Sequence, residues 1–198
     1  DLGDDENRFN PEWVAGVNAA LDEVEAGPHP RAVVLTAQGK VWSNGLDLEW
    51  FAANLSSVND FLIDVHELFA RVLSFGAPTI AAIQGHCFAA GAMLALACDE
   101  RVMRADRGYF CLPEADINIP FTPGMSALIQ ARLAPQQAHE AMVTARRYGG
   151  VDAVSAGIVQ LAVDENEVLP AAKSRAGELA GKDGALRGRE ANTLPTPG

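Results

Sequence analysis

Along the chain, segments in which apolar residues recur at helical spacing alternate with short segments in which they are continuous, as in buried strands. The first long pattern is helical, from an Asn10-Pro11 start to a Gly27-Pro28 stop. A second helical pattern, with one broad apolar face, runs from about Val58 to Phe75. Short continuous apolar runs lie between and after these helices and are typical of strands buried on both faces. These runs are 31–36, 78–83, 101–105, 109–112 and 158–163.

Shorter elements fill the rest of the chain. A strand beginning near Gly39 enters a turn at Gly45, and a short helix is expected over 49–54. Residues 113–123 contain three prolines and little periodicity, which favours a structured loop. Further helices are expected over 124–133, 135–145, 152–156 and 167–180. The alternation predicts an α/β fold with right-handed crossovers, in a single domain over 1–180 and a loosely ordered tail over 181–198.

Residues 85–99 stand out because small residues occupy the whole connection between a predicted strand and a helix with almost no polar face. At the start of such a helix, the backbone N–H groups are open and the helix dipole favours negative charge. Small side chains let a ligand approach that backbone closely. The same pattern is typical of a tight corner packed in a core, so the stretch alone does not identify a site.

Composition and charge narrow the classes of function. The chain has 198 residues, 48% of them hydrophobic, and a formal net charge of −11, which argues against nonspecific binding to nucleic acid or to anionic membranes. No apolar run is long enough to span a membrane, and the acidic N-terminus lacks the features of a signal peptide. The three cysteines lack metal-ligand or redox spacing. We expect a cytoplasmic protein without a metal site.

Two turns follow predicted parallel strands, one at Gly45-Leu46 and one at Ala89-Ala90-Gly91. If these strands are neighbours, both turns lie at one sheet edge and their N–H groups can converge on an oxyanion. A third segment, 112–121, places Glu114 and Asp116 among apolar residues. Burial there would raise the pKa of a carboxyl group, as proton transfer near neutral pH requires. The same two carboxylates are equally typical of helix caps or of partners for arginine.

Other chemistries find little support in the sequence. There is no G-x-S-x-G serine elbow, no G-x-G-x-x-G dinucleotide motif and no phosphate-binding P-loop. None of the four histidines has metal-ligand spacing. His66 lies beside Leu62 and Phe69 on the long helix, which favours a place at the helix flank or core edge, and His86 lies close to the second turn.

Several segments together resemble one family. The run 42–48, Trp-Ser-Asn-Gly-Leu-Asp-Leu, is followed in order by 78–85, Gly91, Cys98-Asp99 with Arg101, and Pro113-Glu114. Downstream come Arg146-Arg147-Tyr148 and the run 152–159. As a set they are similar to the crotonase superfamily of enoyl-CoA hydratases and isomerases. The resemblance implies a crotonase-like fold, a ββα spiral core with C-terminal helices.

The resemblance also implies a substrate and a binding site. The substrate would be an acyl-CoA thioester, so coenzyme A is part of the substrate and no separate cofactor is expected. Its carbonyl oxygen would be held by the backbone N–H groups of Leu46 and Ala90. The implied contacts with the CoA moiety are Ser43, Asn44, Gly45, Asp47 and Lys40, with Arg146, Arg147 or a neighbouring subunit as further sources of cations. Family members imply a homotrimer or a dimer of trimers.

The carboxylates discriminate between reactions. Family hydratases use two glutamates to activate water, and the positions that correspond to them here are Met93 and Glu114. A single base suits an isomerase that moves a double bond from C3 to C2, with an apolar lining at Met93, Ile119 and Phe121 that excludes water. One alternative is a hydratase in which Asp116 or another carboxylate replaces the missing glutamate. Another is a homologue that binds acyl-CoA without turnover.

Overall fold

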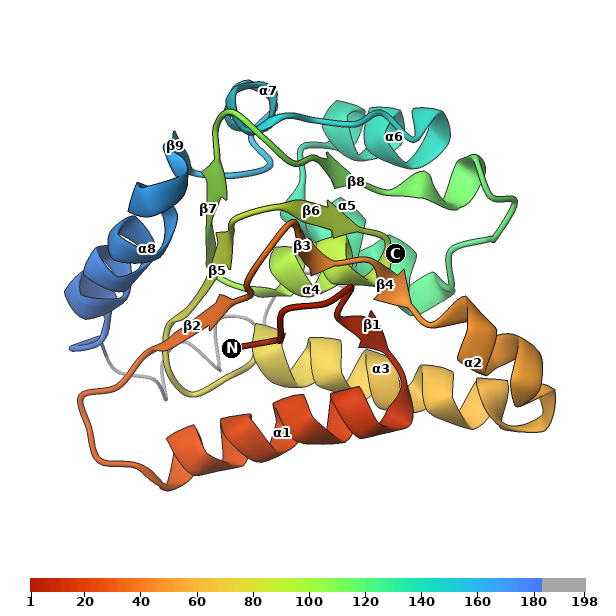
Figure 1. Ribbon diagram of the computed structural model, residues 1–198, viewed down its shortest axis with the longest axis horizontal. Helices are drawn as coiled ribbons and strands as arrows, with labels where there is room; N and C mark the ends of the chain where they lie inside the picture. The colour runs from red at the N-terminus through yellow and green to blue at the C-terminus, as the bar shows by residue number, and fades with distance from the viewer. Residues whose placement is uncertain (183–198) are drawn as a thin grey trace.

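The computed structural model describes residues 1–182 and contains three parallel sheets (Figure 1). The four-stranded sheet has the order β2 (Val33–Thr36), β5 (Thr79–Ile83), β7 (Glu100–Arg104) and β9 (Leu161–Val163). The three-stranded sheet has the order β3 (Val41–Ser43), β6 (His86–Phe88) and β8 (Phe110–Cys111). The two-stranded sheet pairs β1 (Arg8–Phe9) with β4 (Gly45–Leu46). The α/β class expected from the sequence is confirmed.

Helices surround these sheets and also fill the space between them. They are α1 (Pro11–Ala26), α2 (Leu48–Ala53), α3 (Val58–Leu73), α4 (Ala90–Ala97), α5 (Pro123–Arg132), α6 (Pro135–Thr144), α7 (Gly150–Ser155) and α8 (Glu165–Leu179). Two short 3-10 helices, η1 (Leu55–Ser57) and η2 (Pro113–Ala115), precede α3 and follow β8. None of the helices in the described part of the chain is long and apolar enough to cross a membrane.

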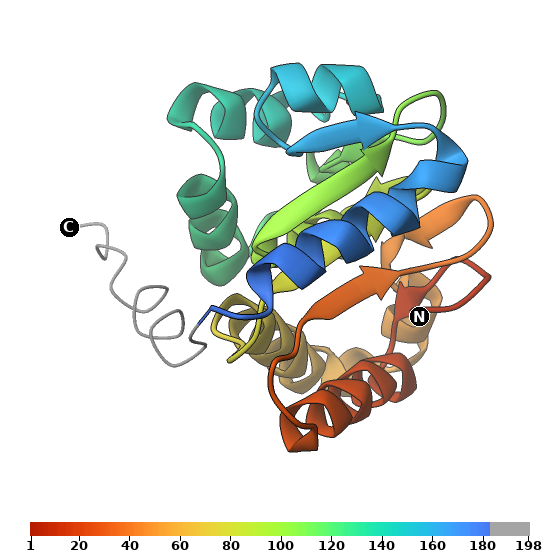
Figure 2. The same ribbon diagram turned by 90° about the vertical axis from the view of Figure 1, so that its left-hand side faces the viewer.

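The four-stranded sheet is buried on both faces, which explains the continuous apolar run of β5. Helix α8 lies across one face, where Ile80 and Ala82 pack in a small cluster with Val168 (Figure 2). The alternate residues, Ala81 and Ile83, belong to the main core on the other face. Side chains of a strand alternate between faces, so a strand between two apolar layers is apolar on both. The one polar residue of β5, Thr79 at its start, donates its hydroxyl to the Asp99 carboxylate at 2.9 Å.

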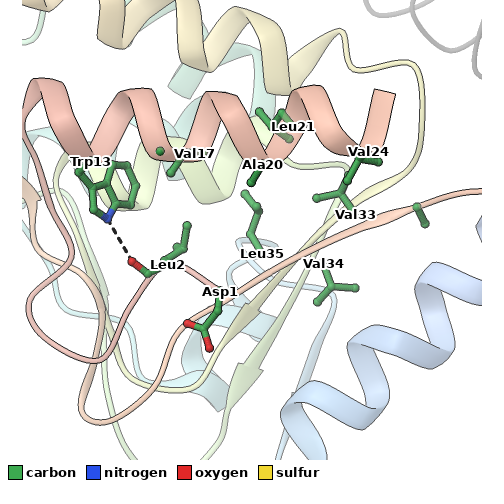
Figure 3. A pocket seen from close by; sticks show the side chains of 12 residues that line it. Asp1, Leu2, Trp13, Val17, Ala20, Leu21, Val24, Val33, Val34 and Leu35 are labelled. Atoms are coloured by element: carbon green, nitrogen blue, oxygen red, sulfur yellow. Dashed lines mark hydrogen bonds between the residues drawn. The ribbon is translucent and has the colours of Figure 1, made fainter. Parts of the chain in front are cut away.

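A groove with a volume of about 440 Å³ lies between α1 and β2 (Figure 3). Leu2 closes one end, where its N–H donates to the carbonyl of Thr36 at 2.7 Å and its carbonyl accepts from the Trp13 indole at 3.1 Å. Its walls are apolar side chains of α1 and β2, including Leu21 and Val33. None of the predicted site residues lines it, so we do not place the reaction there.

The structure corrects several expected elements. Residues 86–88 were expected within a turn of small residues but form strand β6, because they pair with β3 on one side and β8 on the other. The expected loop 113–123 contains η2, and α5 already begins at its last residue. The expected strand 158–163 begins at Leu161, because the N–H of Ile158 closes the end of α7 on the carbonyl of Ala153. The predicted tail lies outside the described residues from residue 183 onward.

Candidate active site

The three strands of the second sheet end at one edge, and a predicted site segment follows each of them. The strands are parallel, with Ser43 opposite Cys87 and Cys87 opposite Phe110. The carboxyl ends of β3, β6 and β8 lead directly to Gly45-Leu46, to Ala89-Ala90 and to η2, which contains Glu114. The structure therefore brings the two backbone turns and the buried carboxylate to the same side of the molecule (Figure 1).

The two backbone turns touch one another. A Cβ atom added to Gly45, whose φ is +80°, would lie 2.8 Å from the backbone nitrogen of Ala90 and 2.8 Å from the Cβ atom of Ala89. Only glycine permits both this backbone conformation and this approach. The N–H of Ala89 donates to the carbonyl of Cys111 at 3.0 Å, which ties the second turn to β8. These contacts hold three parts of the molecule together: the turn at Gly45, the start of α4, and the end of β8 that leads to Glu114.

Two residues predicted to contact CoA have side chains that support the first turn. The Ser43 side chain is fully buried; its hydroxyl donates to the carbonyl of Asn7 at 2.8 Å and accepts from the N–H of Gly45 at 3.1 Å. The Asp47 carboxylate accepts from the N–H of Trp50 at 3.1 Å and caps α2. We therefore assign both side chains to the conformation of the turn, while Asn44 stays half-buried between them.

Helix α4 begins at Ala90, and its first turn points toward this edge. The first N–H groups of a helix have no partner within the helix, so the start of α4 offers donors with a partial positive charge. Every residue from Ala90 to Ala97 is buried, which keeps water away from the helix dipole. Ala89 precedes the helix with φ 52° and ψ −126°, a region that is costly for a residue with a side chain.

Two arginines cap the other end of this helix. Arg101, which is 3% exposed, donates to the carbonyls of Ile158 at 2.6 Å and of Cys98 at 2.9 Å. Arg132 donates to the carbonyls of Cys98 at 2.6 Å and of Leu96 at 2.8 Å. Positive charge at a helix carboxyl end is favourable, and these bonds satisfy carbonyls that would otherwise be buried without a partner.

The Glu114 side chain has the environment of a proton-transfer group. The residue is 6% exposed, and its Oε2 atom has no hydrogen-bond partner among the described residues. Burial raises the pKa of Glu114 to about 7, because the charged form is poorly solvated there. Within residues 1–182 Glu114 forms no salt bridge. It lies inside the 3-10 helix η2 and not at a capping position of any helix. The two alternative roles considered from the sequence are therefore not observed. Asp116, by contrast, is exposed.

The predicted acyl-lining residues come from two elements. Met93 is 1% exposed and lies within α4, where its N–H donates to the carbonyl of Ala89. Ile119 and Phe121 lie in the loop between η2 and α5; Ile119 is 37% exposed, and Phe121 packs against the main core. No carboxylate therefore stands one turn into α4, where a water-activating glutamate would be.

The predicted cations differ in their positions. Lys40 is exposed and precedes β3, so it lies at the opposite end of that strand from Leu46. Arg146 is paired with Glu140 at 2.9 Å and stacks on Tyr148. The guanidinium of Arg147 lies 5.9 Å from the centre of the Phe88 ring, on the strand that leads to Ala90. Of these three cations, Arg147 is the one that contacts a strand of the candidate site.

Sequence reasoning missed one polar contact near the site. His66 on α3 lies with its Nε2 atom 2.7 Å from the hydroxyl oxygen of Thr122, which caps α5 by accepting the N–H of Met125. Thr122 followed by Pro123 is a recognisable helix start, but no local pattern links it to a histidine 56 residues earlier. In the described part of the chain, no cluster of three acidic, histidine or cysteine side chains could hold a metal ion.

Comparisons with known proteins identify the family and the fold. The sequence profile of the enoyl-CoA hydratase/isomerase family matches residues 3–187. The chain is 36% identical over 190 residues to enoyl-CoA delta isomerase 2, a peroxisomal protein of Arabidopsis thaliana, and the match covers 91% of this chain and 79% of that protein. An apo structure of an enoyl-CoA isomerase from Mycobacterium tuberculosis is similar, with a TM-score of 0.87 and 26% identity over 94% of this chain and 81% of that one. An enoyl-CoA hydratase from Mycobacterium marinum gives 0.86 and 26%, with the same coverage.

Proposed function

The chain belongs to the enoyl-CoA hydratase/isomerase family and has its crotonase-like fold, and we propose that it is an isomerase that moves the double bond of an enoyl-CoA from C3 to C2. One observation carries this proposal. Glu114 is a buried carboxyl group with a pKa near 7 and an unpartnered oxygen, and it lies at the edge where two backbone turns meet. At the place of a second glutamate stands the buried, apolar Met93.

The reaction needs only one base. The carboxylate of Glu114 removes a proton from C2 of the 3-enoyl thioester, and the electrons of that C–H bond delocalise onto the thioester oxygen as a dienolate. The carboxylic acid that results then donates the proton to C4, the electrons return, and a C2–C3 double bond forms beside the restored carbonyl. A pKa near 7 suits both proton transfers, because Glu114 must first accept the proton from C2 and then donate it to C4.

The dienolate oxygen would be held by the backbone N–H groups of Leu46 and Ala90. The contact between Gly45 and Ala90 supports this assignment, because it places the two turns side by side. One such preorganised donor is typically worth about 3–4 kcal/mol of barrier. Burial of α4 strengthens the contribution of Ala90, because water does not screen the helix dipole.

The acyl chain would lie against Met93, Ile119 and Phe121. Such an apolar lining keeps water from C3, which favours migration of the double bond over hydration. The CoA moiety would extend from the acyl group along the turn that contains Asn44 and Gly45. Its phosphates need nearby cations, because the chain has a net charge of −11. We propose Arg147 as one of these, because it already lies against β6; Lys40 is a second candidate from the other end of β3.

Hydration is the second candidate, because a structurally similar relative is named an enoyl-CoA hydratase. In that case another carboxylate, such as Asp116, would have to activate water. Asp116 is exposed and its backbone N–H is bonded within the turn of η2. It therefore lacks the buried setting of Glu114, and we favour isomerisation.

The proposal is tested by assaying a 3-enoyl-CoA and a 2-enoyl-CoA side by side. We expect double-bond migration with the first substrate and water addition at least a hundredfold slower with the second. Comparable rates that disappear in Asp116→Ala would instead identify a hydratase. Tight binding of both thioesters with no turnover of either would identify a non-catalytic acyl-CoA-binding homologue.

Assembly stays a prediction of the family resemblance, and the cytoplasmic location stays a prediction from the sequence. Trimers or dimers of trimers are checked by sedimentation equilibrium of the purified chain. The three cysteines are free and buried, which is compatible with the cytoplasmic location expected from the sequence.

A further inference from the structure

His66 and Thr122 connect two helices through a contact that the proposed chemistry does not use. Nε2 of His66 lies 2.7 Å from the hydroxyl oxygen of Thr122, and the imidazole also packs close to Gly124 in the first turn of α5. Helices α3 and α5 both pack against α4, which carries Ala90 and Met93. The contact therefore fixes the two neighbours of the central helix relative to each other.

Thr122 also ends the loop 116–122, which connects the turn of Glu114 with α5. The near end of this loop is held by backbone bonds, from the N–H of Asp116 to the carbonyl of Pro113 at 2.9 Å and from the N–H of Ile119 to the carbonyl of Glu114 at 3.0 Å. Residues 116–120 are exposed. Among residues 1–182, His66 is the only side chain of another element that forms a hydrogen bond with this loop.

The two ends of the loop are therefore held by different means. Burial and the tight turn of η2 hold Glu114 independently of His66. The far end is held by the first turn of α5, where the N–H groups of Met125 and Ser126 donate to Thr122. It is also held by the packing of Phe121 against the core and by the bond between His66 and Thr122. Losing the bond to His66 would loosen Phe121 and the side chain of Ile119, while Glu114 and the backbone N–H of Ile119 that its carbonyl accepts keep their positions.

We propose that His66 is a positioning residue that sets the acyl-chain-length preference by holding the far end of the 116–122 loop. This inference rests on the proposed function, in which Ile119 and Phe121 line the acyl chain. A short acyl chain needs only the geometry around Glu114. A long acyl chain also needs the two apolar side chains of the loop in place.

Three variants test the proposal in the full chain. His66→Leu removes the hydrogen bond, His66→Gln keeps an N–H group at a similar reach, and His139→Leu is a matched control on the exposed surface of α6. The readouts are kcat and KM with C6 and C12 3-enoyl-CoA. For His66→Leu we expect kcat on the C6 substrate within twofold of wild type, and a rise in KM for the C12 substrate of about fivefold, the size of one lost neutral hydrogen bond. We expect His66→Gln and His139→Leu to match wild type.

Thr122 provides an independent check. Thr122→Val removes the partner of His66 together with the cap of α5, whereas Thr122→Ser keeps both. In a Thr122→Val background, His66→Leu should no longer change the ratio of C12 to C6 activity. An equal effect of His66→Leu in both backgrounds would overturn the proposal, since the effect would then not pass through Thr122. So would an equal loss on C6 and C12 substrates, which is the result of general destabilisation.

Binding separates this inference from the isomerase assignment. Saturated C6- and C12-CoA cannot react, and their affinities are measured by calorimetry for wild type and His66→Leu. A selective loss of C12 affinity without any isomerase activity in wild type would support the role of His66 and contradict the isomerase assignment. Isomerase activity with an unchanged ratio of C12 to C6 affinity would contradict the role of His66 alone.

Discussion

In the proposed isomerisation Glu114 would accept and release a proton within one turnover, and its burial would set the pH at which it could do so. Burial raises the pKa of the group to about 7. A base works in its deprotonated form, so activity depends on the fraction of Glu114 that is ionised in the free enzyme. If Glu114 is the base, its apolar surroundings decide the working pH of the enzyme.

We expect kcat/KM for a 3-enoyl-CoA to rise tenfold per pH unit below about pH 7 and to level off above it. The measurement is initial rate at low substrate concentration between pH 5 and pH 9. A profile that is flat over this range, or that has its midpoint near 4.5, would show that the buried carboxyl group is not the base.

The same shift has a consequence for stability. Because burial raises the pKa of Glu114 in the folded state above its ordinary value of 4.5, the folded chain binds this proton more tightly than the unfolded chain. The free energy of unfolding therefore falls as pH rises from about 4.5 to about 7 and is constant beyond, by roughly 3 kcal/mol in total.

Glu114→Gln removes this titration. In urea unfolding we expect the variant to be up to about 3 kcal/mol more stable than wild type at pH 8, with little difference at pH 4.5. Asp116→Asn, in the same loop but exposed, is the matched control and should show no such pH-dependent gain. A difference that does not change between the two pH values would contradict the buried, proton-binding state of Glu114.

At the scale of elements, α4 connects the core to the site. Its amino end supplies Ala90, and its carboxyl end is held by Arg101 and Arg132. Both arginines donate to backbone carbonyls that would otherwise be buried without a partner. The position of the site thus depends on contacts at the far end of a buried helix.

Arg101→Met tests this dependence. Loss of the guanidinium leaves the carbonyl of Ile158 without its donor, whereas the carbonyl of Cys98 keeps its bond from Arg132. We expect a loss of about 1–3 kcal/mol in the free energy of unfolding. Arg175→Met, which removes an exposed pair with Glu100, should cost about 1 kcal/mol or less. Similar losses in the two variants, measured by urea unfolding, would mean that the helix cap contributes little.

The elements that could be predicted are those whose signals are local. The long helices α1 and α3 and the buried strand β5 follow from apolar spacing and from caps such as Asn10, whose side chain does accept from the N–H of Trp13. Strand β6 could not be found in this way. Its three residues form a strand only because β3 and β8 lie on either side of it.

In the candidate site, too, some features could be predicted from local sequence and others depend on the fold. The apolar neighbours of Glu114 predicted a buried carboxyl group, and two glycine-containing turns predicted backbone donors. The role of Ser43 as an internal support was not visible, because its partner Asn7 becomes a neighbour only in the fold. The cap of α2 by Asp47 is a local signal, since its partner is the N–H of Trp50 three residues later. Which residues share one strand edge is a property of the sheet rather than of any segment.

At the scale of the whole molecule, the net charge of −11 opposes an anionic ligand. CoA phosphates approach through a repulsive field that reaches about 30 Å at 10 mM salt and about 8 Å at 150 mM. Long-range repulsion of this kind acts mainly on the association rate, whereas a local contact such as the one proposed for Arg147 would act mainly on dissociation.

We therefore expect the association rate constant of acyl-CoA to rise as ionic strength increases from 10 to 150 mM. Stopped-flow measurement with a fluorescent acyl-CoA provides the rate, and a neutral acyl-pantetheine of the same chain length is the control, with no salt dependence. An association rate that falls with salt would mean that local cations dominate the field at the entrance of the site.

The central claim is that one buried carboxylate carries out the proton transfer, and Glu114→Gln tests it most directly. The variant keeps the size of the side chain but cannot act as a base at neutral pH. With a 3-enoyl-CoA we expect kcat to fall by about 10²–10⁴-fold, the usual contribution of a general base, with an unchanged affinity for a saturated acyl-CoA and an unchanged far-ultraviolet circular dichroism spectrum. Isomerisation within tenfold of wild type by the folded variant would contradict the claim.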